Sequence, residues 1–338
     1  MQSDIAVETI DTHTAGEPTR ILTDGIDRAR IRGGDVGEQR DRFATHYDWL
    51  RELLMCEPRG HADMFGAVPT LPNAPEADLG LFFMDGQGYL DMCGHGTMGA
   101  VTALIETGRL EPADRIVVET PAGLVATSPT VTDGRVEDVT VRNVRSYVAD
   151  QCEHTMTTGE ADEPRSLSVD VVSAGNAFAL VDVADLDLDL EVSPENADTF
   201  VDLGLEIRRR LNENGGIVDP LAGTRRRVSI VEFYESGPSA DRNVVVFGDG
   251  QVDRSPCGTG TCAKMTLLHA RGDLEVGERY RYESLIGSEF TGRLLEVEHR
   301  DGVAVTTPEV TGSAYITGRH TFLADARDEL DGFTLSDA

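Results

Sequence analysis

The chain carries "CGHGTMGAVTALIETG" at residues 93–108 and "CGTGTCAKMTLLHARG" at residues 257–272. The two stretches align without a gap. They share a leading cysteine, two glycines and a threonine at the start, a threonine and a leucine further on, and a final glycine. In each one, apolar residues recur at helical spacing before the final glycine, which suits a helix C-terminus. We predict two helices, each with its cysteine at the N-terminus, that arose by duplication within the chain.

The segments before these helices repeat in the same order, namely strands, an amphipathic helix and further strands. The first amphipathic helix is predicted in "EQRDRFATHYDWLRELLMCEP". Its apolar face is Phe43, Tyr47, Leu50 and Leu54. The second is predicted to start at Pro194 with Ser193 as its cap. Its apolar face is Phe200, Leu203, Ile207 and Leu211.

This double order predicts the fold class α+β (α/β), with two similar domains whose cysteine helices face each other across a cleft. A chain of 338 residues is long for one core, which also favours two domains. The polar, turn-rich segment 149–166 is where we predict the boundary, so that the first domain covers 1–150 and the second begins at 151.

The composition is strongly acidic, with 60 Asp and Glu against 30 Lys and Arg and a formal net charge of −30. Such a charge argues against binding nucleic acid or an anionic membrane. Nearly all the positive charge is arginine, and Lys264 is the only lysine. A dense acidic surface with so little lysine is typical of proteins from salt-loving organisms, so the charge predicts a habitat rather than a substrate.

Neither a signal peptide nor a membrane span is visible, because the N-terminal residues contain no basic segment before an apolar one and no apolar run approaches 18 residues. We therefore expect a cytoplasmic protein. The five cysteines have no regular spacing, which does not suggest a disulfide framework. Cys56, Cys152 and Cys262 lack the glycine-rich context of the other two and are expected to be structural.

Cys93 and Cys257 are the candidate acid and base. A helix N-terminus offers unpaired N–H groups and a partial positive charge, which stabilise a thiolate and can bind a carboxylate. Inversion at the α-carbon of an amino acid needs a base on one face and an acid on the other. Because substrate and product are mirror images at that carbon, a duplicated cysteine site suits the reaction in both directions.

Three other interpretations of the same segments are weaker. "GHGTMG" matches the dinucleotide-binding pattern G-x-G-x-x-G, but no apolar strand runs straight into its first glycine. The phosphate-loop pattern fails because Lys264 does not follow a glycine. Cys257 and Cys262 have no second ligand pair at the usual spacing, so a zinc site is poorly supported and no metal is expected.

"MCGHGTMGA" together with "DRSPCGTGT" closely resembles the proline racemase family, which includes proline racemase, 4-hydroxyproline 2-epimerase and trans-3-hydroxyproline dehydratase. "DTHTAGEPTRI", "EPRGHADMFGA" and "GSAYITGRHTF" extend the resemblance over nearly the whole chain. It implies a fold like that of diaminopimelate epimerase, with two similar α/β domains around a cleft. The C-terminal segment, about 315–338, would return to the first domain and leave about 151–314 as the second. The resemblance also implies no cofactor, no metal and a homodimer.

Carried over by motif, Cys93 and Cys257 would be the acid and base residues. The dehydratases typically have threonine at the second position, so Cys257 favours a racemase or epimerase. The resemblance further implies that His95 and Asp253 contact the substrate amine. The backbone N–H groups implied to bind its carboxylate are those of Gly94, His95, Gly258 and Thr259.

Phe65 and Phe247 match positions where proline racemases carry aromatic residues that pack on the unsubstituted ring. An apolar wall would leave a substrate hydroxyl unpaired, so both favour proline over hydroxyproline as the small-molecule substrate. "SAGNAFA" at 173–179 departs from the double-glycine, aromatic-rich form of the family, which affects the predicted shape of the pocket.

Two functions from other classes remain as alternatives to the racemase or epimerase. A nucleotide-linked oxidoreductase would gain thermal stability from NAD(P). A non-catalytic binding protein would bind proline without exchanging its α-proton.

Overall fold

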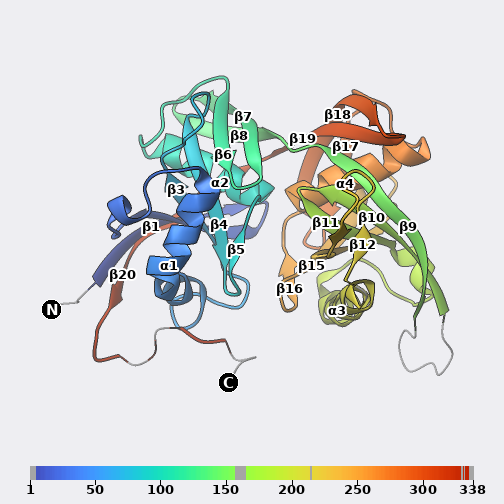
Figure 1. Cartoon of the computed structure of the whole chain (residues 1–338), viewed down its shortest axis with the longest axis horizontal. Coiled ribbons are helices and arrows are strands. Elements are labelled where there is room, and N and C mark those ends of the chain that lie inside the picture. The colour runs from blue at the N-terminus through green and yellow to red at the C-terminus, as the bar shows by residue number, and fades with distance from the viewer. Residues whose placement is uncertain (1–4, 157–164, 214, 329, 331, 335–338) are drawn as a thin grey trace. The chain divides into compact units, whose positions relative to one another are not determined.

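The computed structural model describes residues 5–156, 165–213, 215–328, 330 and 332–334, without the side chains of 152–156, 165 and 166. Contacts divide the chain into two units. Unit 1 is formed by residues 1–141 and 312–338, and unit 2 by residues 142–311 (Figure 1). The predicted boundary near residue 150 therefore falls inside the first strand of unit 2, and the C-terminal return begins at Gly312.

Unit 1 is a twisted sheet that holds two helices. The strands β20, β1, β2, β3, β4, β6 and β7 follow one another across it, and β5 pairs with β4. The β2–β3 and β4–β6 pairs are parallel and the other pairs are antiparallel. Its elements are β1 (Ile5–Thr14), β2 (Glu17–Asp24), η1 (Arg28–Arg30), α1 (Val36–Met55), β3 (Phe65–Thr70), β4 (Leu79–Asp85), β5 (Tyr89–Leu90), α2 (Gly94–Glu106), β6 (Ile116–Thr120), β7 (Gly123–Thr132), β8 (Arg135–Arg142) and β20 (Ala314–Ala324).

Unit 2 repeats this order. The strands β9, β10, β11, β14, β15, β17, β18 and β19 follow one another, and β16 pairs with β15. The parallel pairs β11–β14 and β15–β17 occupy the places of the two parallel pairs in unit 1. Its elements are β9 (Ser146–Met156), β10 (Arg165–Ala174), β11 (Asn176–Asp182), η2 (Val183–Leu186), η3 (Pro194–Asn196), α3 (Ala197–Asn212), β12 (Ile217–Val218), β13 (Arg225–Arg226), β14 (Ile230–Glu235), β15 (Asp241–Phe247), β16 (Gln251–Asp253), α4 (Gly258–Arg271), β17 (Tyr280–Ser284), β18 (Glu289–Arg300) and β19 (Val303–Gly312).

The mixed α and β content confirms the predicted fold class. In unit 1, α1 packs on the sheet through its predicted face, and Phe43, Leu50 and Leu54 are fully buried in one cluster with Val68 and Phe82. In unit 2, Phe200 and Ile207 of α3 are buried in a separate cluster with Phe233 and Val246. Each unit therefore has its own apolar core.

Three local predictions were wrong. The polar stretch from 149 was predicted as a boundary loop, but β9 continues to Met156 and pairs with β10, because backbone hydrogen bonds form a hairpin whatever the polarity of its side chains. Ser193 does not cap α3 with its side chain, and a 3₁₀ turn precedes that helix. Leu203 is only partly buried, while Gly204 meets Val246 in the core.

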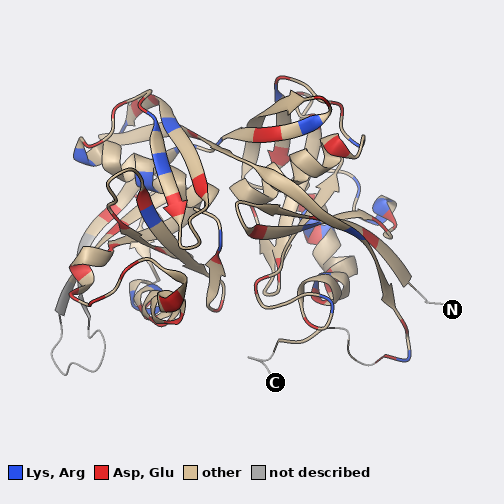
Figure 2. Ribbon diagram, turned by 180° about the vertical axis from the view of Figure 1, so that it is seen from behind, with Lys and Arg blue, Asp and Glu red and all other residues tan. Residues whose placement is uncertain are grey.

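Figure 2 shows the acidic residues spread over both units rather than gathered on one face. Within the described residues, no helix combines the length and apolar character needed to cross a membrane. The salt adaptation, the cytoplasmic location and the homodimer stay predictions.

Candidate active site

Cys93 is the N-cap of α2, as predicted. Its backbone is extended, and its Sγ accepts a hydrogen bond from the backbone N–H of Gly96 at 3.3 Å. The first-turn N–H groups of Gly94 and His95 have no acceptor inside the helix. The helix N-terminus thus presents a sulfur atom beside two amide donors.

His95 lies directly against this sulfur, with its Nδ1 3.2 Å from Cys93 Sγ. Burial lowers the pKa of His95 to about 3, so the imidazole is neutral at ordinary pH. A neutral ring can accept a hydrogen bond from the thiol or donate one to the thiolate, depending on its tautomer. Thr14 on β1 holds the residue by donating a hydrogen bond to His95 O at 2.9 Å.

Phe65, at the start of β3, packs its ring against the imidazole of His95 with centroids 4.6 Å apart. It is only 2% exposed. Close packing requires two glycines of "GHGTMG": a Cβ at Gly96 would lie 2.8 Å from the ring of Phe83, and one at Gly99 would lie 2.6 Å from Thr12 Oγ1. Because α2 follows the short antiparallel strand β5, the dinucleotide-binding arrangement of a parallel strand leading into a helix is not present there.

Cys257 is the N-cap of α4 and differs from Cys93 in its backbone, which has a φ of 59°. A residue other than glycine in this region is strained, and such strain is often held at functional sites. Cys257 Sγ accepts a hydrogen bond from the N–H of Gly260 at 3.4 Å and lies 3.6 Å from Thr259 Oγ1. The N–H groups of Gly258 and Thr259 have no acceptor inside the helix.

Asp253, at the end of β16, is linked to Cys257 through Ser255. Asp253 Oδ1 accepts hydrogen bonds from Ser255 N and Oγ, and Ser255 Oγ accepts one from Cys257 N. Burial raises the pKa of Asp253 to about 6, against the hydrogen bonds from Ser255. Burial, followed by the charges of Asp253 and Glu232, raises the pKa of Cys257 well above its ordinary range.

The structure therefore brings the predicted residues together in two sets. Unit 1 holds Cys93, Gly94, His95 and Phe65. Unit 2 holds Cys257, Gly258, Thr259 and Asp253, with Phe247 half-buried at the end of β15 beside the turn into β16. That the two sets meet one substrate stays a prediction.

The structure adds residues that the sequence patterns did not predict, above all Glu232, Asn243 and Ser255. A charged residue inside the apolar strand "IVEFYE" could have identified Glu232, and the isolated Lys264 could have drawn attention to the same region. No comparable feature of the sequence points to Asn243 or Ser255.

The other cysteines contribute no site. Cys56 and Cys262 are both buried, and burial raises the pKa of Cys262 to about 12. The side chain of Cys152 lies outside the described residues. Among the residues that the structure does describe, no cluster of His, Cys, Asp and Glu is arranged to hold a metal ion.

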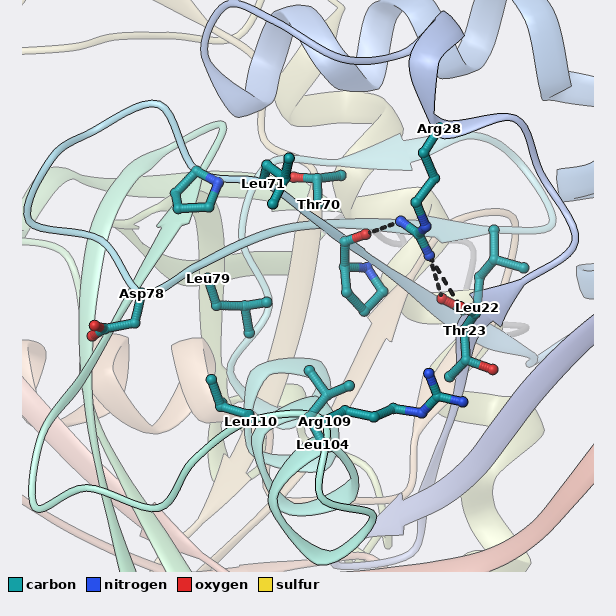
Figure 3. A pocket seen from close by; sticks show the side chains of 12 residues that line it. Leu22, Thr23, Arg28, Thr70, Leu71, Asp78, Leu79, Leu104, Arg109 and Leu110 are labelled. Atoms are coloured by element: carbon teal, nitrogen blue, oxygen red, sulfur yellow. Dashed lines mark hydrogen bonds between the residues drawn. The ribbon is translucent and has the colours of Figure 1, made fainter.

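A cavity of about 350 Å³ in unit 1 is separate from the predicted residues (Figure 3). Leu104 and Arg109, near the C-terminal end of α2, line it, so it lies at the opposite end of the helix from Cys93. Arg28 donates hydrogen bonds to Pro69 O, Leu22 O and Thr23 O at its wall. These bonds hold the arginine in a structural role.

A family model described as proline racemase matches residues 9–334. A protein named proline racemase from Clostridioides difficile is 42% identical over 337 residues, which cover 98% of each chain. A protein named 4-hydroxyproline 2-epimerase from Streptosporangium roseum is 37% identical, covering 96% of this chain and 97% of that protein. The crystal structure of a hydroxyproline epimerase from Agrobacterium vitis with bound trans-4-hydroxy-L-proline is 29% identical and has a TM-score of 0.86, covering 98% of this chain and 96% of that one. The chain therefore belongs to the proline racemase family, and it is an isomerase of the racemase and epimerase kind.

Proposed function

We propose that this enzyme inverts the α-carbon of proline without a cofactor, with Cys93 and Cys257 as the paired acid and base. The observation that carries the proposal is the repetition of one feature. In each unit a cysteine caps a buried helix, accepts the N–H of the residue three positions on, and leaves two first-turn N–H groups for a ligand.

The proposed reaction balances in protons and electrons. One cysteine begins as thiolate and takes the α-proton, so that the C–H electron pair stays on the substrate as an enediolate. The other cysteine begins as thiol and gives its proton to the opposite face of the same carbon. The product is the mirror image, and the two cysteines have exchanged protonation states. The N–H groups of Gly94, His95, Gly258 and Thr259 would stabilise the carboxylate as its charge increases.

Asp253 and His95 are proposed to bind the substrate amine. A neutral imidazole can accept a hydrogen bond from the ammonium, and an ionised Asp253 can pair with its charge. Both are buried, so neither is screened as a surface group would be.

Proline is favoured over hydroxyproline by Phe65 and Phe247, because an apolar ring wall cannot pair a hydroxyl group. The identity of 42% to a relative named proline racemase, against 37% to one named 4-hydroxyproline 2-epimerase, also supports proline.

The direct experiment incubates the reduced protein in D₂O and molar salt with L-proline and, separately, with trans-4-hydroxy-L-proline. NMR follows the α-proton and chiral chromatography follows configuration. We expect deuterium entry with inversion, and kcat/KM at least about tenfold higher for proline.

Other outcomes name the alternatives. Faster inversion of hydroxyproline would identify the enzyme as a 4-hydroxyproline 2-epimerase. Loss of water from trans-3-hydroxy-L-proline would identify it as a dehydratase. Binding of proline without exchange would identify a binding protein. A rise in melting temperature with NAD(P), without exchange, would favour an oxidoreductase.

The pH dependence of KM tests the role of Asp253. Since its pKa is raised to about 6, its carboxyl group is protonated below that pH and ionised above it. Pairing with the substrate ammonium needs the ionised form, so KM for L-proline should rise as pH falls through about 6. Asp253→Asn should raise KM above about pH 6, where the wild-type carboxyl group is ionised, and should remove this step. A wild-type KM that is flat between pH 5 and 7 would contradict the assignment.

A further inference from the structure

The two cysteine helices rest on chemically different groups. Gly96 in α2 and Gly260 in α4 are equivalent positions, each three residues after its cysteine. A Cβ at Gly96 would meet aromatic ring carbons of Phe83 and Phe65 at 2.8 and 3.1 Å. A Cβ at Gly260 would instead meet Glu232 Oε2 at 2.4 Å. The first turn of α2 therefore lies on aromatic rings, and the first turn of α4 lies on a carboxyl group.

The carboxyl group of Glu232 is close to the thiol of Cys257. Cys257 Sγ lies 3.3 Å from the same Cβ position at Gly260. Sγ and Glu232 Oε2 are consequently no more than about 6 Å apart. Glu232 and Cys257 are 0% and 8% exposed. A charge at this distance in a buried site acts strongly on the ionisation of its neighbour.

Glu232 is incompletely hydrogen-bonded. Tyr282 donates its hydroxyl to Glu232 Oε1 at 2.6 Å, whereas Oε2 is buried without a partner. Asn243, a diagonal neighbour on β15, faces the same side of the sheet. Its Nδ2 donates to Pro256 O at 2.8 Å, and its buried Oδ1 also lacks a partner. The Asn243 side chain nevertheless acts on the Glu232 carboxyl group and lowers its pKa, against the larger effect of burial.

Burial raises the pKa of Glu232 to about 7, so the neutral acid prevails below that pH and the carboxylate above it. Lys264 opposes this rise only in part: its Nζ lies 3.1 Å from the ring centroid of Tyr234, and its charge lowers the pKa of Glu232 less than the hydrogen bond from Tyr282 does. The titratable groups that interact with Glu232 are Asp253 from β16, Tyr280 and Tyr282 from β17, and Cys257, Cys262 and Lys264 from α4 and its cap.

We propose that Glu232 is a positioning residue whose buried carboxyl group holds Cys257 in the thiol form, so that Cys257 starts as the proton donor and Cys93 as the base. This inference rests on the proposed function. It gives the two cysteines different protonation states in the resting enzyme, although each cysteine acts as acid and as base over a full cycle of forward and reverse reactions.

Glu232→Gln tests the proposal because glutamine keeps the size of the side chain and can still accept the hydrogen bond from Tyr282. The readout is the rate of iodoacetamide alkylation of each cysteine between pH 6 and 10, resolved by peptide mass spectrometry. We expect Cys257 in the variant to react at least about tenfold faster at pH 8.5, because the charge opposing its thiolate is gone. The alkaline limb of the kcat/KM profile should move to lower pH.

Two controls separate this effect from a general one. Glu283→Gln removes a charge from β17 that pairs with Arg242 at the surface, and it should leave the Cys257 profile unchanged. Cys262, in the same helix, should remain slow in every variant. An unchanged Cys257 rate in folded Glu232→Gln would overturn the proposal.

A wild-type measurement covers the case in which Glu232→Gln does not fold. At pH 8, Cys93 should be alkylated at least about tenfold faster than Cys257, and equal rates would overturn the inference. Its failure is distinct from failure of the proposed function. A protein that inverts proline with equal cysteines would refute only the inference, whereas a faster Cys257 in Glu232→Gln without inversion of any proline would refute only the function.

Discussion

Replacing either Cys93 or Cys257 with alanine is expected to lower kcat/KM for L-proline by at least about 10³-fold, because inversion needs an acid and a base at once. The fold should be retained, since each cysteine is small and its helix keeps the remaining first-turn bonds. Chiral chromatography measures the rate, and circular dichroism with the melting temperature reports the fold.

The matched control is Cys262→Ala, which removes a thiol five positions after Cys257 in the same helix. It creates a small cavity and is expected to cost about 1 kcal/mol of stability while keeping most of the activity. Near-normal inversion by either the Cys93 or the Cys257 variant would refute the two-base assignment.

Gly96→Ala should reduce activity about 100-fold and lower the free energy of unfolding by about 1–3 kcal/mol, the usual range for overpacking. The added methyl would lie 2.8 Å from Phe83 Cε1 and 3.1 Å from Phe65 Cε1. Both rings are almost fully buried and cannot move away freely. The first turn of α2 must therefore shift, and Cys93 and His95 shift with it.

Gly88→Ala is the control in the same unit, because a Cβ there meets nothing within 4 Å. The double variant Gly96→Ala/Phe83→Leu should recover part of the activity, since a smaller side chain leaves room for the methyl. Urea unfolding and inversion kinetics measure both effects. A Gly96→Ala enzyme with normal kinetics would show that the close contact does not position Cys93.

Structural features that depend on residues close together in the sequence could be predicted, whereas features that depend on strand pairing could not. The two N-cap cysteines and the buried face of α1 depend on residues a few positions apart, so local sequence patterns identified them. The contact between Glu232 and the first turn of α4 depends on how β14 pairs with its neighbours. No local pattern predicts which side chain will lie beneath Gly260.

Strand pairing also explains why the predicted domain boundary at 149–166 was wrong. β9 is polar along much of its length, and its stability comes from pairing with β10 rather than from its own sequence preference. The φ of 59° at Cys257 could not be predicted from the sequence either, because the equivalent residue Cys93, the N-cap of α2, has an extended backbone. The duplication therefore predicted equal cysteines where the structure has unequal ones.

The pairing of β1 with β20 affects how the protein folds during synthesis. Unit 2 is one continuous segment, whereas unit 1 is completed by a strand near the end of the chain. Synthesis proceeds from the N-terminus, and a domain folds as a unit once its residues are available. Unit 2 can thus fold on the ribosome while β1 is paired with β2 alone, and a chain truncated before residue 314 would leave the other edge of β1 open to pairing with another molecule.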